Sequence, residues 1–403
     1  MSKHRACAAP SWALLVVGLV PGWLGCQRAR QTENAERALT ALETASIERA
    51  LTTYASIASR SYSDAAREAR VLLDRVDRFV ATPSAASLAE ARQAWLGARH
   101  PYQQTEVFRF YDGPIDRLEM RINTWPIDEA YVDGTGQTGK LGIVADGKRY
   151  PELTSELIAS LNAKEGETSI STGYHVIEFL LWGADARVDG PGERPFTDYV
   201  GDERAVRRGH YLHLVVALLA RDLEELRDAW APDRDNYRKK LLALPPAEAL
   251  GLAIKGMGSL SGPELAGERL TVAYETKAQE NEHSCFSDNT VNDLTDDALG
   301  IENVCLGRYE LPGGPALRGP GLCDAIAARD PALGERLRRA VADSVAKVRA
   351  IPTPFDQAIL GDDAAPGRVA IKRAIAALEA QTSLLAAVAA VYDLRRSPAE
   401  ARR

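Results

Sequence analysis

Apolar residues recur along most of the chain at intervals of three and four positions, which is the periodicity of α-helices. This spacing runs from about Ala35 to Phe79, and a second helix is expected to begin after Thr82 and to pass through Trp95. Further helical stretches are expected at about 203–229, 264–284, 334–349 and 367–394. The alternation typical of β-strands is scarce. The pattern therefore predicts an all-α protein.

Loops rich in Gly, Pro and Asp break the predicted helices into blocks. They fall at 131–151, 184–200, 311–321 and 352–367. The loop at 184–200 lies near the middle of the chain. We therefore expect one folded region over 27–396, with a first helical half at about 33–190 and a second at about 200–396.

The two halves contain a short internal repeat. A set of four residues in the first half recurs at the same spacing 176 positions later. The first set is Gln103, Glu106, Phe110 and Asp112, and the second is Gln279, Glu282, Phe286 and Asp288. Each set follows a predicted helix and leads into a loop. We therefore expect two related helical bundles, duplicated and pseudo-twofold, with a cleft between them.

One short apolar stretch, Gly173–Gly183, carries a histidine and a glutamate three positions apart. Possible N-caps precede it, and Gly183 stands where a C-cap glycine belongs, so the stretch is expected to be a helix. His175 and Glu178 would then share one face. Because such a helix is buried, its imidazole and carboxylate must be hydrogen-bonded, paired or coordinating something. Di-iron bundles hold metal with this spacing, and a structural pair that satisfies itself is the alternative.

Several carboxylates of the first half could approach this helix. Individually they are typical of turns and helix caps. Together with a histidine they would offer the mixture of oxygen and imidazole ligands that iron prefers. They are Glu106, Asp112, Asp116, Asp128 and Glu129.

Other functional motifs are absent or incomplete. The loop Gly134–Lys140 matches a phosphate-binding loop in part, but Leu141 stands where Ser or Thr is required, and no strand precedes it. The sequence contains neither HExxH nor GxSxG, which disfavours conventional zinc peptidases and hydrolases. With 49 basic and 56 acidic residues the formal charge is −7, and no basic face stands out. Nucleic acid is therefore not an expected partner.

The first 25 residues are expected to be an export signal. Lys3 and Arg5 precede an apolar run that is too short to span a bilayer. The residues that follow, Leu24, Gly25 and Cys26, look like the end of a bacterial lipobox, in which Cys26 is lipidated. We expect a lipoprotein in the periplasm or at the cell surface, and a simple cleaved signal is the alternative.

Three cysteines lie in the predicted second half, at Cys285, Cys305 and Cys323. In an oxidising compartment one pair among them could form a disulfide and leave an odd thiol. Which pair does so cannot be read from the sequence. No CxxC spacing occurs, so a thiolate metal site has no support.

Four stretches in order along the chain resemble the imelysin family, also called peptidase family M75. One of them is Gly173-x-His175-x-x-Glu178, which looks like the G-x-H-x-x-E signature of that family. The other three are Pro101–Asp116, Gly258–Arg269 and Asn281–Thr290. The resemblance is closest to the branch of iron-regulated protein A and insulin-cleaving membrane protease. It implies an exported or lipid-anchored bacterial protein of two helical bundles, linked to iron uptake, with some members described as peptidases.

The resemblance implies that His175 and Glu178 are the histidine and glutamate of the family motif. Glu106 and Asp112 correspond only loosely to the acidic residues of the metal-binding members. Gln103 stands at a position where a carboxylate would support metal binding better. The second-half blocks supply further cleft candidates, among which His283 could have a structural or a site role. These candidates are Ser259, Ser261, Glu268, Arg269, Glu282 and His283.

Three hypotheses follow. In the first, His175, Glu178, Glu106 and Asp112 bind iron, another divalent metal or a metal-bearing ligand for iron uptake, with the membrane and envelope iron-uptake proteins as partners. In the second, the protein is an M75-type endopeptidase in which Glu178 is the general base and His175 helps to activate water. In the third, a helical scaffold docks an envelope partner and binds no metal.

Overall fold

The computed structural model describes residues 38–134, 141–187 and 190–394 of the 403-residue chain. The expected signal peptide and the expected lipidation site at Cys26 lie outside the described residues. Within the described ranges the fold is all-α, as predicted, and the only strands are the short antiparallel pair β1 (Arg308–Tyr309) and β2 (Leu317–Arg318).

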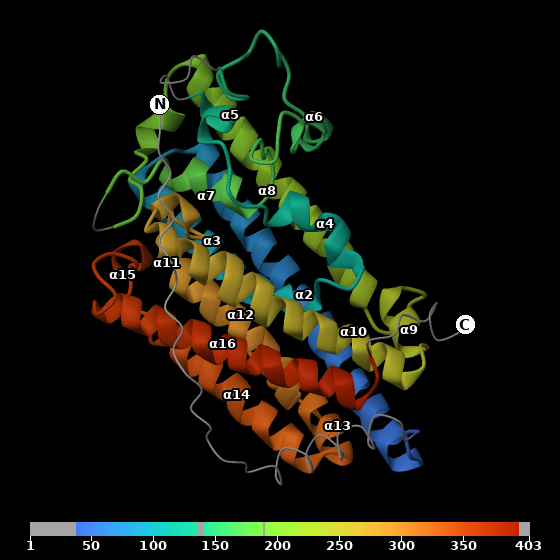
Figure 1. Cartoon of the computed structure of the whole chain (residues 1–403). Helices are drawn as coiled ribbons and strands as arrows, with labels where there is room; N and C mark the ends of the chain where they lie inside the picture. Colours follow the sequence, from blue (N-terminus) through green and yellow to red (C-terminus); the bar gives the residue numbers. More distant parts are fainter. Residues whose placement is uncertain (1–37, 135–140, 188–189, 395–403) are drawn as a thin grey trace, which may run out of the picture.

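In the described part of the chain, the long helices form the body of the molecule (Figure 1). They are α2 (Ala41–Ala81), α3 (Ala85–Gln103), α8 (Glu203–Trp230), α10 (Pro246–Ser259), α12 (Thr290–Leu306), α14 (Pro331–Arg349) and α16 (Pro366–Val391). Shorter helices connect them: α4 (Pro114–Ile122), α5 (Glu129–Asp133), α6 (Ser155–Leu161), α7 (Tyr174–Trp182), α9 (Tyr237–Leu242), α11 (Val272–Thr276), α13 (Leu322–Arg329) and α15 (Phe355–Ala358). Three 3₁₀ turns, η1 (Glu106–Phe108), η2 (Phe196–Tyr199) and η4 (Gln279–Asn281), and the π-helical segment η3 (Leu260–Thr271) complete the fold.

The long helices pack in two groups. In the first, α2 packs along both α3 and α8, and in the second, α14 packs along α16 and α12. The groups meet where α12 packs on α3 and α13 packs on α2. Helix α8 follows the central loop in sequence, yet its most extensive packing is with α2 from the first half. The proposed duplication of the two bundles stays a prediction.

Amphipathic stripes explain why the long helices pack in this way. In α16 the buried residues Ile371, Ala374, Leu378 and Leu385 recur at intervals of three, four and seven, which places them on one face. This helix is long and apolar enough to cross a membrane by length and composition alone. Here its stripe packs against α14, α10 and η3.

The helix expected over 264–284 is only partly present. Helical backbone instead runs without a break from α10 through the π-helix Leu260–Thr271, which contains Pro263, and regular α-helix ends at Thr276. The next residue, Lys277, has a left-handed backbone with φ +53°, which closes the helix. The residues up to Asn289 therefore form a loop, and this loop reaches the candidate site.

Buried and half-buried polar contacts join α3 and its C-cap Gln104 to α12, and we call them the polar seam. All of its hydrogen-bonding pairs connect residues more than 190 positions apart in sequence. The pairs are Arg99 with Asp293, His100 with Asp296 (2.8 Å), Gln104 with Asp296 (3.2 Å) and Gln104 with Asn303 (2.9 Å). Since buried polar groups need partners, these pairs fix the position of one group of helices on the other.

One disulfide is present among the described residues. Cys305 at the end of α12 is bonded to Cys323 at the start of α13. Cys285 is free and buried in the loop before α12. The sequence predicted one pair and one odd thiol, and the structure identifies which cysteines they are.

Candidate functional site

Helix α7 begins at a glycine that no other residue could replace without strain. Gly173 has φ +91°, and a Cβ atom there would lie 2.6 Å from the carbonyl oxygen of Ile122 at the end of α4. Gly173 is the N-cap, and no side chain caps this helix. Every residue of α7 is buried. The close backbone contact at Gly173 therefore places the helix, and with it His175 and Glu178, in the core.

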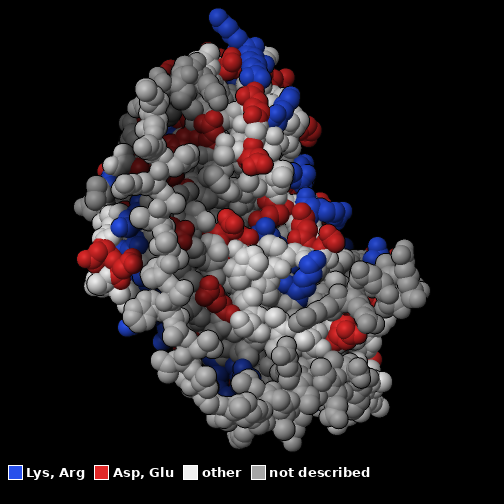
Figure 2. All heavy atoms as spheres, in the orientation of Figure 1, with Lys and Arg blue, Asp and Glu red and all other residues white. Residues whose placement is uncertain are grey.

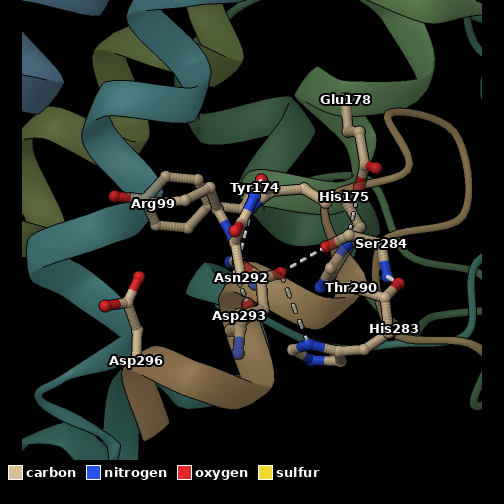
Figure 3. Close-up of polar contacts among 12 residues, drawn as sticks. Arg99, Tyr174, His175, Glu178, His283, Ser284, Thr290, Asn292, Asp293 and Asp296 are labelled. Carbon is tan, nitrogen blue, oxygen red and sulfur yellow. Dashed lines mark hydrogen bonds and ion pairs between the residues drawn. The ribbon is translucent and has the colours of Figure 1, made fainter. Parts of the chain in front are cut away.

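His175 and Glu178 contact each other on one face of α7 (Figure 3). The Nδ1 atom of His175 lies 3.0 Å from Oε2 of Glu178. The other carboxyl oxygen, Oε1, accepts hydrogen bonds from Ser287, at 2.9 Å from its backbone nitrogen and 2.6 Å from its hydroxyl. Both oxygens of Glu178 are therefore engaged. The Nε2 atom of His175 is buried and has no hydrogen-bond partner within the described structure.

Burial makes this pair neutral near pH 7. It raises the pKa of Glu178 to about 8, against the opposing effect of the Ser287 hydrogen bonds. It also lowers the pKa of His175 well below its ordinary value, and the nearby His283 adds to that effect. His175 therefore carries a neutral imidazole, the form that can bind a metal.

Aromatic rings surround the imidazole of His175. The ring of Trp125 lies 5.1 Å from it and the ring of His283 lies 4.8 Å from it, measured between centroids. Burial lowers the pKa of His283 to about 4, with a further contribution from Arg269. Its Nδ1 atom lies 3.7 Å from Asp293 and has no hydrogen-bond partner within the described residues.

Asp293 anchors this region as a buried anion. Arg99 donates to it through Nε and Nη2, at 3.3 and 2.7 Å, and neither side chain is exposed. Asn289 and Ser284 donate to the same carboxylate. Burial alone would raise the pKa of Asp293, but the positive charge of Arg99 outweighs it and holds this pKa well below the usual range. Figure 3 shows Asp293 between Arg99 and His283.

A second buried cluster lies beside the first and is centred on Arg269 from η3. This guanidinium donates to Glu106 (2.9 Å), Glu264 (2.8 Å) and Asp297 (2.5 Å). Arg109 forms a further ion pair with Glu106. Burial would raise the pKa of Glu106, but Arg109 and Arg269 outweigh it and lower that pKa to about 2. The carboxylate of Glu106 is thus ionised and held by arginines.

A pocket of about 320 Å³ opens between the two clusters. Its lining includes Trp125 and His283 from the first cluster and Arg109 and Arg269 from the second, with Asn123 between them. Three of its buried donor atoms have no acceptor within the described structure. They are Nδ2 of Asn123, Nε1 of Trp125 and Nε of Arg109. The pocket is therefore lined by groups that an acceptor-rich ligand would satisfy.

The cleft candidates from the second half are divided among several places. Glu268, Arg269 and His283 line the pocket. Ser261 instead donates to the carbonyl of Leu378 (3.0 Å) and packs η3 on α16, while Ser259 is half-buried on α10 outside the pocket lining.

Glu282 is buried in the loop after η4. Its carboxyl oxygens have no hydrogen-bond partner within the described residues. Burial raises its pKa to about 9, and the nearby Asp356 and Asp288 add to the effect. Its carboxyl group is therefore protonated at neutral pH.

The structure does not assemble the four expected metal ligands. His175 and Glu178 are together, but Glu106 is held by arginines in the second cluster, and Asp112 is exposed in the turn before α4, with φ +61°. Among the residues that the structure describes, no three His, Cys, Asp or Glu side chains converge to hold a metal ion. A bare cation therefore has no ready-made site of three protein ligands here.

Arg99, Trp125, Ser287 and Asp293 were not among the expected site residues. Ser287 lies within Asn281–Thr290, one of the stretches that resemble the family, but the resemblance assigned it no role. Nothing in the sequence pairs Arg99 with Asp293, because they lie 194 positions apart.

Known proteins resemble this chain in sequence and fold. A model of the Imelysin family, Peptidase M75, matches residues 58–385. Iron-regulated protein A of Synechococcus elongatus is 27% identical over 345 residues, which cover 83% of this chain and 80% of that protein.

Two solved structures share the fold. A protein from Parabacteroides distasonis described as an iron-regulated protein A precursor gives a TM-score of 0.69 at 19% identity, over 89% of this chain and 97% of that one. An imelysin-like protein from Psychrobacter arcticum gives 0.55 at 15% identity, over 86% and 94%. With a family match that covers most of the sequence and two structures of the same fold, the chain belongs to the Imelysin family.

Proposed function

We propose that this protein binds a metal-bearing ligand, an iron chelate, in the cell envelope as part of iron uptake. The iron assignment is supported by the name of its relative in Synechococcus, iron-regulated protein A. Export and a lipid anchor at Cys26 are supported by the leader sequence, and they would hold the protein at a membrane beside envelope iron-uptake proteins.

One observation carries the proposal: the buried, unpartnered Nε2 atom of His175. Metal-binding histidines commonly use one ring nitrogen as the ligand while the other contacts a carboxylate, which fixes the orientation of the ring. Glu178 contacts Nδ1 here, and Ser287 holds Glu178 in turn. For Nε2 to bind a metal, Nδ1 must carry the imidazole proton and donate to Oε2, so binding selects the tautomer protonated on Nδ1. A buried polar atom without a partner is costly unless a ligand satisfies it.

A chelate fits this site better than a bare ion. The described residues supply imidazole nitrogens from His175 and His283 but no third convergent ligand. A ligand that brings most of its own donor atoms needs only one or two from the protein. His175 does not itself line the neighbouring pocket, but His283 does, with its ring centroid 4.8 Å from that of His175, so a chelate would have to shift this part of the wall to reach Nε2. The oxygen atoms of the chelate would accept hydrogen bonds from Asn123, Trp125 and Arg109, three lining residues with buried, unpartnered donors.

The test is a titration of the metal-free protein, from Gln27 onward, with ferric nitrilotriacetate and separately with ferrous ion. We expect saturable binding of the chelate and a loss of at least about tenfold in affinity for His175→Ala, as one lost metal or charged contact predicts. His210→Ala is the matched control, since His210 is exposed on α8. Equal binding by wild type and His175→Ala would refute the proposal.

The peptidase hypothesis receives less support from the geometry. A general base must be ionised at the working pH and must reach the water that it activates. Glu178 is fully buried, both of its oxygens are engaged, and its pKa of about 8 keeps it protonated at pH 7. Hydrolysis of unfolded peptides that disappears in Glu178→Gln would restore this alternative. Absence of both chelate binding and hydrolysis would favour the scaffold that docks a partner.

A further inference from the structure

A second and larger pocket, of about 570 Å³, lies at the junction of α5, the end of α7 and the start of α8. None of its lining residues belongs to the two clusters described above. Four arginines line it: Arg187, Arg194, Arg204 and Arg208. Neither the iron hypothesis nor the motif residues account for this concentration of guanidinium groups.

A single buried aspartate orients three of these arginines. Asp133 at the end of α5 accepts hydrogen bonds from Arg194 (2.9 Å) and Arg208 (2.9 Å), and Arg204 lies 3.4 Å away. Burial would raise the pKa of Asp133, but Arg194 and Arg208 outweigh it and lower that pKa. One ionised carboxylate thus holds several guanidinium groups in fixed positions.

The lining of the pocket carries more positive than negative charge. Four arginines face three carboxylates, those of Asp133, Glu193 and Asp198, so the lining has a formal charge of 4 − 3 = +1. Glu193 is paired with Arg187, and Asp198 is paired with Arg194 at 3.2 Å. The chain as a whole has a formal charge of −7. Figure 2 shows the more usual arrangement, with acidic and basic side chains mixed over the visible face.

Some guanidinium nitrogens in the pocket have no partner in the described parts of the chain. The side chain of Arg194 is only 6% exposed, and its buried Nε–H group has no hydrogen-bond acceptor in those parts. Arg204 uses Nη2 alone for its hydrogen bonds, and its side chain is 42% exposed. Arg204 therefore offers donors to a ligand in the pocket, and Arg194 has a further donor that no described group satisfies.

We propose that this pocket binds a small organic anion through a carboxylate or phosphate group. Guanidinium groups pair with either oxyanion through two parallel hydrogen bonds, which makes arginine the preferred residue for such ligands. The wall of Trp182, Ala184 and Ala186 gives an apolar surface for the carbon skeleton. The volume lies within the range of about 300–1,000 Å³ that small-molecule pockets occupy.

The test is titration calorimetry of the protein from Gln27 onward with succinate and, separately, with inorganic phosphate. We expect saturable binding of at least one probe, weakened about tenfold or more in Arg204→Gln, because a charge-assisted hydrogen-bonding group is lost. Arg204→Lys keeps the charge without the fork and should recover only part of the affinity. The control is Arg339→Gln, an exposed arginine on α14.

The outcomes separate the sources of the anion and the two sites. Binding of succinate alone indicates a carboxylate ligand, and binding of phosphate alone indicates a phosphorylated one. No saturable binding of either probe, equal binding by wild type and Arg204→Gln, or equal weakening in Arg339→Gln would overturn the proposal. Circular dichroism checks that Arg204→Gln is folded, and its binding of the iron chelate should be unchanged.

Discussion

Replacing Glu178 by glutamine should change how the stability of the protein depends on pH. The carboxyl group of Glu178 is fully buried, and burial raises its pKa from an ordinary value of 4.5 to about 8. Between these two values the folded protein keeps a proton that the unfolded chain has released. The stabilising effect of that proton is complete below the unfolded pKa and is lost as the pH rises towards the folded pKa.

The size of the effect follows from the pKa. Each pH unit in this interval lowers the free energy of unfolding of the wild type by about 1.4 kcal/mol. From about pH 5 to about pH 8 the loss from Glu178 is therefore roughly 4 kcal/mol. Glutamine has a similar shape and does not titrate, so Glu178→Gln should escape this loss. Other buried acids such as Glu282 titrate in both proteins, and their effects largely cancel in the difference.

Urea unfolding followed by tryptophan fluorescence, at about pH 5 and about pH 8 and with a chelator present, measures the difference. The stability of Glu178→Gln relative to wild type should rise by roughly 4 kcal/mol between these pH values. Glu335→Gln, which changes an exposed carboxylate on α14, should show no such trend. A difference between Glu178→Gln and wild type that stays constant with pH, within about 1 kcal/mol, would refute a protonated Glu178.

Three further predictions concern stability. Arg99→Met should lower the free energy of unfolding by about 3–5 kcal/mol, because Asp293 is left buried without its main cation; a smaller loss in urea unfolding than about 1 kcal/mol would contradict this. Replacing both disulfide cysteines by serine should cost about 3 kcal/mol, as expected for a loop of 18 residues, and reduced wild type should unfold at the same urea concentration as this variant. Gly173→Ala should cost at least about 1–3 kcal/mol in backbone strain and weaken chelate binding, whereas Gly97→Ala, where a new Cβ meets nothing within 4 Å, should not; equal melting temperatures of the two would count against the role of Gly173.

Of the long helices, five were predictable from their apolar periodicity, but α10 and α12 were not expected. In α12 the buried face carries polar side chains such as Asp293, Asp296 and Asp297, which hide the apolar stripe. The helix expected at 203–229 is α8, Glu203–Trp230, and the one expected at 367–394 is α16, Pro366–Val391. Periodicity failed at 264–284, where a π-helix and the left-handed Lys277 replace a regular helix. Backbone conformations of that kind depend on tertiary packing and leave no simple pattern in the sequence.

The centre of the candidate site was predictable, and its surroundings were not. The spacing of His175 and Glu178 put both on one helical face, and the structure joins them. The surrounding groups come from distant segments. Trp125 follows α4, about 50 residues before the helix, and Ser287 and Asp293 lie more than 100 residues after Glu178. Only the fold brings these groups to the helix. The arginine pocket was missed for the same reason.

The polar seam between α3 and α12 limits how the molecule can move. The cleft expected from the sequence between two helical bundles would suggest a hinge that swings them apart to admit a ligand. Such a swing would separate Arg99 from Asp293, and breaking one buried ion pair costs about 3–5 kcal/mol. We therefore expect the two helical groups to stay together while the short segments that carry Trp125 and His283 shift aside. Local motion of those few residues, and not a separation of the two helical groups, would then set how fast a ligand reaches His175.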